Sequence, residues 1–291
     1  MKRKSRRTTN SNGMRRSKLG NFGVNLILTI LGIFMVLPMI YTISSALKPM
    51  DELWMFPPRF FVQNPTTENF KELFRVLNDS VVPFTRYLFN TVLVSVVATT
   101  VHVILASMCA YALAKHKFPG SKFMFSVITT ALLFNATVTA IPNFMIMTSL
   151  NLLDSPLSLM LPAIGSALGL YLMKQFMEQM LNDSILEAAR IDGAGEWKIF
   201  WKIAMPMVKP AWLTLIIFSF KDLWNIGGTV YIHTEEWKTF NYAMSQIMAG
   251  GIARAGVGSA AAVIMLIVPV GLFLLTQSNI VETMGASGLK E

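Results

Sequence analysis

The sequence predicts an all-α polytopic membrane protein with six transmembrane helices. Of its 291 residues, 53% are hydrophobic and 14% are charged, whereas about 25% are charged in soluble domains. Long stretches carry almost no charge, and each has the roughly 20 residues that a helix needs to cross a bilayer core. The single cysteine, Cys109, excludes an internal disulfide and a CxxC metal site, and the three histidines are scattered. No metal site is expected.

The N-terminal region predicts a basic tail followed by a signal-anchor helix. Residues 1–18 contain eight lysines or arginines and no acid, and residues 19–47 carry no charge. That uncharged run is longer than the about 7–15 apolar residues of a signal peptide, and it has no small-residue cleavage site. We therefore expect a tail over residues 1–21 and a first span over 22–45. The basic charge sets topology and suggests no nucleic-acid partner.

The other elements follow from alternating polar and apolar stretches. Residues 48–86 are polar, and their prolines indicate a loop with a short helix at about 67–77. The third span should be broken by Pro142. The fourth contains a GxxxG pair, Gly165 and Gly169, which favours close approach of another helix. The remaining spans are expected at 87–114, 123–153, 155–173, 207–230 and 257–279.

Residues 174–209 form a polar island that predicts two short helices joined at a glycine elbow. Ser184 and Glu187 fit the S-x-x-E capping box, which satisfies two free amides at a helix start. Gly193 and Gly195 supply the turn. The second helix should carry one amphipathic stripe beside the membrane surface and end at Pro206. The stripe residues are Trp197, Phe200, Trp201 and Ala204.

This island resembles the EAA loop in the permease subunits of binding-protein-dependent ABC importers. The matching positions are Glu187, Ala188, Ala189, Asp192, Gly193, Ala194, Ile203, Pro206 and Pro210. In that family the loop is a cytoplasmic coupling helix that docks into a cleft of a separate ATPase. The resemblance implies polar contacts from Glu187 and Asp192. It also implies close packing at Ala188 and Ala189, and an elbow at Gly193.

Other segments are similar to the maltose-permease-like (MalG-type) branch of this family. They lie at 44–49, 56–58, 64–70, 110–114 and 118–120. The resemblance implies the type I ABC importer fold, a six-span permease domain over 22–280, a cytoplasmic tail over 281–291 and a sugar as the solute. Two departures are Met205, where leucine is usual, and the loss of the family pattern after Trp224 and Asn225.

The distribution of positive charge predicts the orientation. The tails and the loops at 115–122 and 174–209 hold 17 of the 25 lysines and arginines, and the opposite side holds 8. Cytoplasmic segments carry the excess of these residues. Both termini and the polar island should therefore be cytoplasmic. The family resemblance implies a bacterial cytoplasmic membrane.

The chain lacks the motifs of an enzyme. It has no G-x-x-x-x-G-K-[ST] phosphate loop and no visible Ser/His/Asp grouping, so it should not hydrolyse ATP itself. No cofactor is expected in this chain; ATP and Mg would bind a partner ATPase. The resemblance implies four partners: a second homologous permease, an ATPase dimer, an extracytoplasmic solute-binding protein and the sugar.

Polar residues within the spans are candidates for the solute path. Lys221 and Asp222 are the charges inside an apolar span, and intramembrane charges are functional candidates. Adjacent helix positions point about 100° apart, so the two cannot pair tightly. Alternatively the span is shorter and they lie near its outer end or in a wet cavity. Other candidates are Asn135, Thr139, Asn143, Trp224 and Asn225, although polar side chains at this depth also serve as interhelical hydrogen bonds.

Other functions stay open on sequence alone. One is an ABC permease for a peptide or polyamine. Another is an ion-driven secondary transporter with Lys221 and Asp222 as its relay, and an intramembrane enzyme is disfavoured by the missing catalytic grouping.

Overall fold

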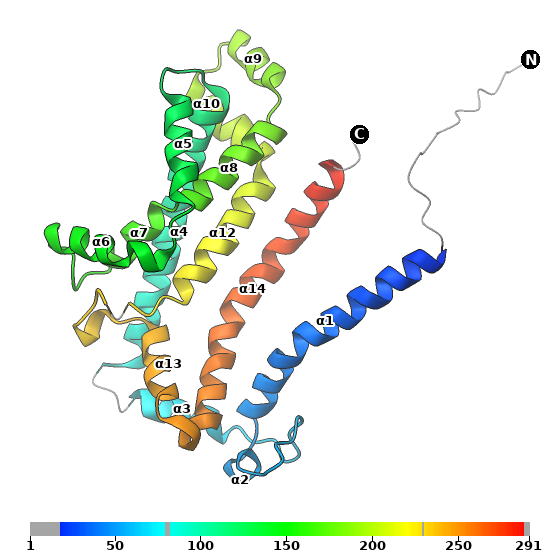
Figure 1. The fold of residues 1–291 in the computed structure, drawn as a ribbon, viewed down its shortest axis with the longest axis vertical. Coiled ribbons are helices and arrows are strands. Elements are labelled where there is room, and N and C mark those ends of the chain that lie inside the picture. Colours follow the sequence, from blue (N-terminus) through cyan, green and yellow to red (C-terminus); the bar gives the residue numbers. More distant parts are fainter. Residues whose placement is uncertain (1–17, 79–81, 229, 288–291) are drawn as a thin grey trace, which may run out of the picture.

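The protein is a bundle of long and broken helices (Figure 1). The computed structural model describes residues 18–78, 82–228 and 230–287, and no strand occurs in these ranges. Four helical segments are long and apolar enough to cross a membrane, and two bent helix pairs raise the number to six if each pair is one span. The predicted six-span, all-α fold is confirmed. The four spans that do not depend on a bent pair lie in α1 (Lys18–Ala46), α4 (Phe84–Lys115), α7–α8 (Leu157–Ile164 and Ala167–Met180) and α14 (Ala255–Ser287).

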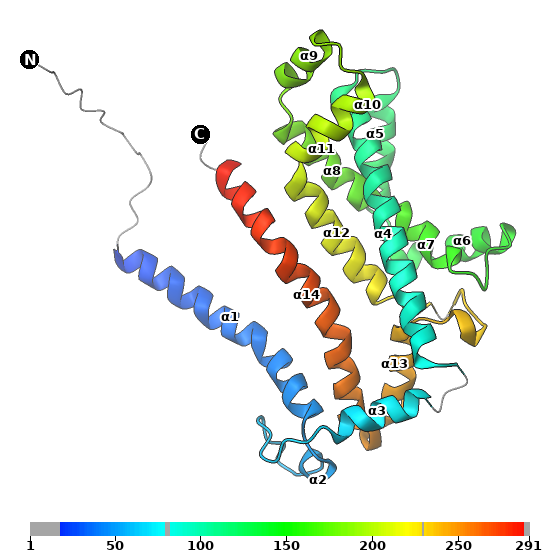
Figure 2. The same cartoon turned by 180° about the vertical axis from the view of Figure 1, so that it is seen from behind.

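Helix α4 is the centre of the bundle, and it packs against α7, α8, α12 (Lys209–Trp224) and α13 (Phe240–Met248). In Figure 2 it runs from the α9 (Asp183–Ile191) end to the end that holds α3 (Glu68–Asn78). It contributes buried residues to all three hydrophobic clusters, through Tyr111 at one end, Val94 in the middle and Tyr87 at the other end. The predicted short helix at 67–77 is α3.

The third span bends, but not where its proline predicts. Helices α5 (Ser121–Ala131) and α6 (Ala136–Ser149) meet at 110°, with the break at residues 132–135. Asn135 caps α6, because its side chain accepts a hydrogen bond from the Thr137 amide at 3.0 Å. Pro142 lies inside α6. A local cap, and not the proline, therefore sets the bend.

A second bend joins α11 (Met205–Met207) to α12 at 79°. Pro206 does not end the preceding helical segment, which continues to Met207, and the turn falls at the fully buried Val208. Pro210 occupies the first turn of α12, where a missing amide costs nothing. The fourth and fifth spans also differ from their predicted limits. Helix α8 continues to Met180, and α12 ends at Trp224 instead of near residue 230.

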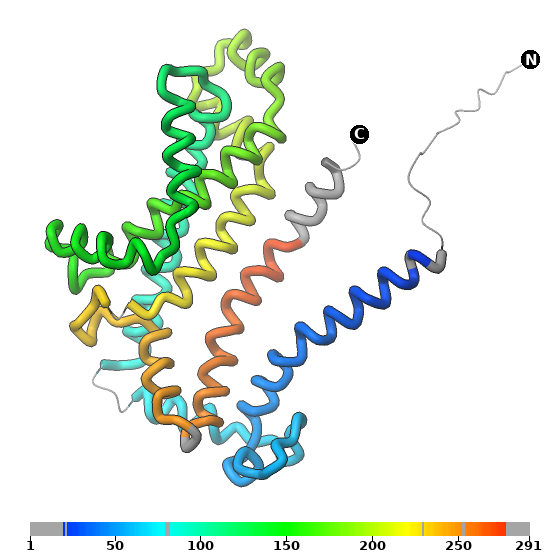
Figure 3. The backbone as a smooth tube through the Cα atoms, viewed as in Figure 1, coloured from blue at the N-terminus to red at the C-terminus, as the bar shows by residue number. Residues whose placement is uncertain are grey.

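Two long apolar helices, α1 and α14, meet at one end and then diverge. Helices α1 and α14 contact each other close to α2 (Met50–Leu53) and α3, and Figure 3 shows them separating toward the opposite end. Ala46 and Ala260 are both fully buried in one cluster at the meeting point. In contrast, no residue in the most apolar window of α1 is buried. Short helical turns, η2 (Glu235–Trp237) and η3 (Gly251–Arg254), flank α13.

Candidate functional site

The predicted EAA island folds as a nine-residue helix, α9, followed by a sharp turn. The capping box does not form, because α9 begins two residues earlier than expected. Asn182 is the N-cap: its side-chain oxygen accepts a hydrogen bond from the Ser184 amide at 3.1 Å and one from the Ser184 hydroxyl at 2.9 Å. Asparagine and serine cap helices about equally well, so Asn182 takes the role assigned to Ser184.

The predicted glycine elbow is a Schellman turn. The Gly193 amide donates to the Arg190 carbonyl, and the Ala194 amide donates to the Ala189 carbonyl, each at 3.0 Å. Gly193 has a φ of +79°, in the left-handed region that glycine adopts without a Cβ penalty. A Cβ at Gly193 would meet nothing within 4 Å, so its backbone angle alone requires glycine. Gly195 has an ordinary φ of −70° and precedes α10 (Glu196–Ile199).

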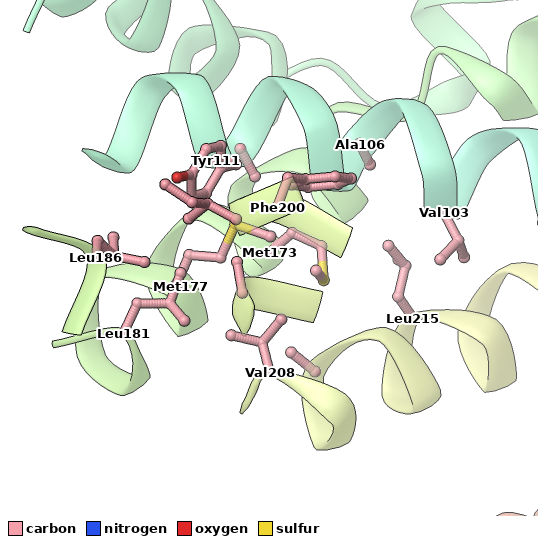
Figure 4. Packing of buried hydrophobic residues seen from close by; sticks show 14 of the residues in the cluster. Val103, Ala106, Tyr111, Met173, Met177, Leu181, Leu186, Phe200, Val208 and Leu215 are labelled. Atoms are coloured by element: carbon pink, nitrogen blue, oxygen red, sulfur yellow. The ribbon is translucent and has the colours of Figure 1, made fainter. Parts of the chain in front are cut away.

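Helix α9 exposes one face and buries the other. The exposed face holds Ser184, Glu187, Ala188 and Ile191, spaced at i, i+3, i+4 and i+7, and continues to Asp192 and Gly193. We call these six residues the docking face. Ile191 is 85% exposed, and sequence reasoning missed it. Ala189 does not belong to this face; it is buried with Leu186 in the chain's own core, where Figure 4 shows Leu186 beside Met177 and Leu181.

The aromatic stripe predicted for the second helix divides between two faces. Trp197 and Trp201 are 65% and 44% exposed, whereas Phe200 is 4% exposed and Ala204 is fully buried. At 100° per residue the two i, i+4 pairs, Trp197 with Trp201 and Phe200 with Ala204, are centred about 60° apart, so one pair is buried while the other faces outward. The segment is also partly a π-helix, η1 (Phe200–Ala204).

Polar contacts hold α9 to its neighbours. The Lys115 ammonium contacts an Asp183 carboxylate oxygen at 2.7 Å, and this hydrogen bond lowers the pKa of Asp183 below its usual range. At the other end of α9, the Arg190 guanidinium donates to Glu196 at 2.7 Å, which raises the pKa of Arg190. The positions of both ends of α9 are therefore fixed by charge pairs.

A cavity of about 450 Å³ lies between α6, the α7–α8 break and α12. It brings together three of the predicted path residues, Thr139, Asn143 and Asp222. Two serines that sequence reasoning missed, Ser166 and Ser219, also line it. The remaining lining is largely apolar, so the cavity offers hydroxyl, amide and carboxylate groups in an apolar frame, as ligand sites commonly do.

The other predicted path residues have different positions. Asn135 caps α6, and Trp224 is buried, with its indole N–H donating to the Met265 carbonyl at 3.0 Å. The Asn225 side chain donates to the Lys221 carbonyl at 2.8 Å and so closes the end of α12. Trp224 therefore joins the end of α12 to the interior of α14, Asn225 closes the end of α12, and neither lines this cavity.

The two charges of the fifth span lie in the last turn of α12. Lys221 and Asp222 are 3.8 Å apart and are mostly exposed, at 63% and 77% of their side chains. This loose contact matches the expected geometry of adjacent helix positions. The alternative of a shorter span with charges near its end is the one that the fold supports.

Of the GxxxG pair, only Gly169 is required for close helix packing. A Cβ on Gly169 would lie 2.1 Å from the His102 ring, so α4 and α8 can approach only because this residue is glycine. A Cβ on Gly165 would meet its nearest neighbour at 3.7 Å, an ordinary contact. The His102 Nδ1 lies 2.8 Å from the Ile164 carbonyl, at the end of α7.

The candidate spans define a polytopic membrane protein, and α9 is an exposed helix at one of its ends. Residues 102–283 match the family model described as "Binding-protein-dependent transport system inner membrane component". The chain belongs to this family, and it is a permease subunit of an ABC importer. It is also an inner-membrane, multi-pass protein in keeping with that family.

Similar proteins extend the comparison. The chain is 29% identical to the diacetylchitobiose uptake system permease protein NgcG of Streptomyces coelicolor, over 68% of this chain and 64% of the relative. It is 30% identical to the sn-glycerol-3-phosphate transport system permease protein UgpE of Yersinia pestis, over 68% and 71%. A chain of a bacterial ABC transporter involved in the import of the acidic polysaccharide alginate matches at 25% identity and a TM-score of 0.74, covering 91% of this chain and 98% of that one.

Proposed function

We propose that this chain is one of two permease subunits of an ATP-driven importer for a carbohydrate, and that its docking face binds the ATPase. The observation that carries the proposal is the docking face itself. A polar helix with an almost fully exposed Ile191 extends from the packed end of the bundle. On this exposed helix Ile191 and Ala188 lie beside the acidic residues Glu187 and Asp192, which gives a mixed apolar and polar surface of the kind found at protein interfaces.

Residues of the docking face take the following roles. Glu187 and Asp192 make polar contacts with the ATPase, and Ala188 permits close packing because it is small and exposed. Gly193 forms the elbow. Ala189 has no docking role, because it is buried. ATP and Mg bind to a dimer of the partner ATPase, whose closure moves α9.

Two more partners complete the importer. The apolar window of α1 has no residue buried within this chain, which supports a second permease and lipid as its covering. The family's dependence on a binding protein supports an extracytoplasmic solute-binding protein as the solute donor. Both termini and α9 lie in the cytoplasm, in keeping with the charge distribution.

The solute is a sugar or oligosaccharide, and Thr139, Asn143 and Asp222 contact it during transport. Hydroxyl and amide groups in the 450 Å³ cavity can exchange hydrogen bonds with sugar hydroxyls. The named solutes of the relatives, diacetylchitobiose and alginate, support this class. A glycerol phosphate is the second candidate because of the UgpE relative. An ion-driven relay is not supported, since Lys221 and Asp222 are exposed and only loosely paired.

A glycine series tests the docking role. In the reconstituted importer, Gly193→Pro should abolish binding-protein-stimulated ATP hydrolysis and uptake, because proline requires a φ near −65°. Gly193→Ala should give a partial loss, since a non-glycine residue in the left-handed region costs about 1–2 kcal/mol. Gly195→Ala is the matched control, because its φ is −70° and a Cβ has free space. Full activity of Gly193→Pro would refute the docking role.

Uptake into proteoliposomes identifies the solute class. Labelled chitooligosaccharide, alginate oligosaccharide, glycerol 3-phosphate, a short peptide and a polyamine should be compared with the cognate binding protein present. Uptake of a saccharide alone, dependent on ATP, supports the proposal. Uptake of the peptide or polyamine alone would overturn the carbohydrate assignment while leaving the permease role intact.

A further inference from the structure

The last turn of α4 and the residue after it hold α9 at both of its ends. At the first end, the Lys115 ammonium donates to the Leu181 carbonyl and to Asp183, each at 2.7 Å. The Lys115 side chain is 7% exposed although it carries a charge. A charged side chain is buried this far only when its hydrogen bonds are satisfied, so this contact has a defined geometry.

At the second end, Glu196 joins three elements. One carboxylate oxygen accepts the Arg190 guanidinium of α9 at 2.7 Å. The other accepts the Tyr111 hydroxyl of α4 at 3.1 Å and lies 3.4 Å from His116 Nε2. Tyr111 is itself 5% exposed, and its ring contacts Phe200 and His116. Glu196 therefore connects the C-terminal end of α9 to the same end of α4 that Lys115 connects to its start.

Contacts at both ends of α9 restrict its orientation more than a contact at one end would. A single exposed ion pair contributes little to stability and allows α9 to rotate about it. Attachments at Asp183 and Arg190, with Leu186 and Ala189 buried between them, fix both the position and the direction of the helix. The docking face then moves only if the end of α4 moves with it.

The other end of α4 is attached in the same manner. The Asn90 amide donates to the Glu236 and Lys238 carbonyls at 2.8 and 3.0 Å, and the Tyr87 hydroxyl donates to Glu235 at 2.7 Å. These partners belong to η2 and the residue after it, which contact α4 near the end that is farthest from α9. Helix α4 thus has polar attachments at both ends and contributes to every hydrophobic cluster between them.

We propose that Lys115 and Glu196 are positioning residues that join α9 and α4 into one rigid unit, so that movement of the docking face passes directly to α4. The inference rests on the proposed docking function, and it names the contacts through which movement of α9 reaches α4. Neither residue touches the solute or the ATPase in this assignment. Their effect is on how much transport each ATP produces.

The test uses the complete importer in lipid nanodiscs and proteoliposomes, with Lys115→Met, Glu196→Gln and the double variant. Glu178→Gln is the matched control, since it breaks a 2.7 Å pair with Lys174 inside α8 that joins no two elements. Lys198→Met is the second control, because Lys198 is exposed and lies two residues from Glu196. Hydrogen exchange of residues 183–194 and the ratio of solute transported to ATP hydrolysed are measured for each.

We expect the double variant to retain its ATPase subunits, to exchange the α9 amides about fivefold faster and to transport about three- to tenfold less solute per ATP. Each single variant should show a smaller change, and both controls none. An unchanged transport ratio in the double variant overturns the proposal, even if exchange rises. Loss of the ATPase from the complex also overturns it, because the residues would then serve docking.

This outcome is separable from failure of the proposed function. If docking is wrong, Gly193→Pro keeps normal stimulated hydrolysis. If only the rigid unit is wrong, Gly193→Pro is inactive while the Lys115 and Glu196 variants transport normally.

Discussion

The two bent spans have opposite surroundings. The bend between α11 and α12 lies inside the core, where Phe200 and Val208 are 4% and 0% exposed. The bend between α5 and α6 lies at the surface, where Leu133 and Phe134 are 84% and 58% exposed. Helix α5 buries no residue, and α6 buries only Met147 among its described residues.

The difference shows that a broken span can be held in two ways. At the core bend, side-chain packing stabilises the turn, together with a hydrogen bond from the Trp212 indole across the turn to the Met205 carbonyl at 3.1 Å. At the surface bend, the Asn135 cap provides local support. A bend held by packing moves with the core around it, whereas a bend held by one cap can change with little cost to the rest of the chain.

The largest difference between the bends should come from removing a phenylalanine at each. Phe200→Ala should lower the free energy of unfolding by about 3–5 kcal/mol, because it leaves a cavity in a packed cluster. Phe134→Ala should cost less than about 1 kcal/mol, since the ring is mostly exposed. Thermal unfolding of the importer in nanodiscs measures both. Equal shifts would show that the surface bend is also packed, by a partner.

Loss of the cap should affect only the surface bend. Asn135→Ala should cost about 1 kcal/mol locally, which corresponds to roughly fivefold faster amide exchange at Thr137–Thr139. Asn143→Ala, in the same helix but not at a cap, is the control. Unchanged exchange in the Asn135 variant would mean that something other than the cap holds α6.

A smaller effect is expected from the hydrogen bond across the core bend. Trp212→Phe keeps an aromatic ring but removes the indole donor, so it should cost about 0.5–1.5 kcal/mol. Trp201→Phe is the control, because Trp201 is 44% exposed. The unfolding midpoint measures the difference, and a loss as large as that of Phe200→Ala would be inconsistent with packing as the main support.

The smallest effect concerns the contact between the loops that follow α6 and α12, which links the two bent spans. The Asp154 carboxylate, in the loop after α6, accepts hydrogen bonds from the His233 and Thr234 amides, in the loop after α12, at 2.9 and 2.7 Å. A further hydrogen bond, from the Thr234 hydroxyl, is the main reason that the pKa of Asp154 is lowered. Its charged form is therefore favoured in the folded protein.

The lowered pKa fixes the direction of the pH dependence. The stabilisation is fully present above the ordinary aspartate pKa of about 3.9 and is lost as pH falls through the lower folded value. Wild type should therefore unfold at a slightly higher temperature than Asp154→Asn at pH 6, and this advantage should shrink as pH falls below about 3.9. Asp51→Asn, on α2, serves as the control. A difference that does not shrink at any pH below about 3.9 would exclude ionisation as its cause.

Much of the fold follows from composition, because apolar length alone specifies a span. The six spans follow in this way, since bilayer thickness sets the apolar length that each needs. The elbow at Gly193 was predictable for another reason, because a turn with a positive φ favours glycine. The bend of the third span is different. Pro142 is the stronger sequence signal, but a single lost hydrogen bond is tolerated inside α6 and the cap at Asn135 determines the break.

The candidate site was partly predictable for similar reasons. The resemblance to the EAA loop implied the positions of Glu187, Ala188 and Asp192, but burial of Ala189 depends on packing against α8 and against α4, which is distant in sequence. The meeting of Thr139, Asn143 and Asp222 in one cavity could not be derived from periodicity, because three separate elements form it. The contacts of Lys115 with Asp183 and of Glu196 with Tyr111 could not be predicted either, because they join separate helices.

The meeting of α1 with α14 affects how the protein is made. About 200 residues separate the two helices, so at roughly 5–20 residues per second the ribosome needs about 10–40 s between them. During that interval α1 waits in the bilayer without the helix that Ala46 packs against. The surface formed by Ala260 and Ala261 thus completes the assembly of the chain, and we expect substitutions there to leave α1 exposed to membrane quality control.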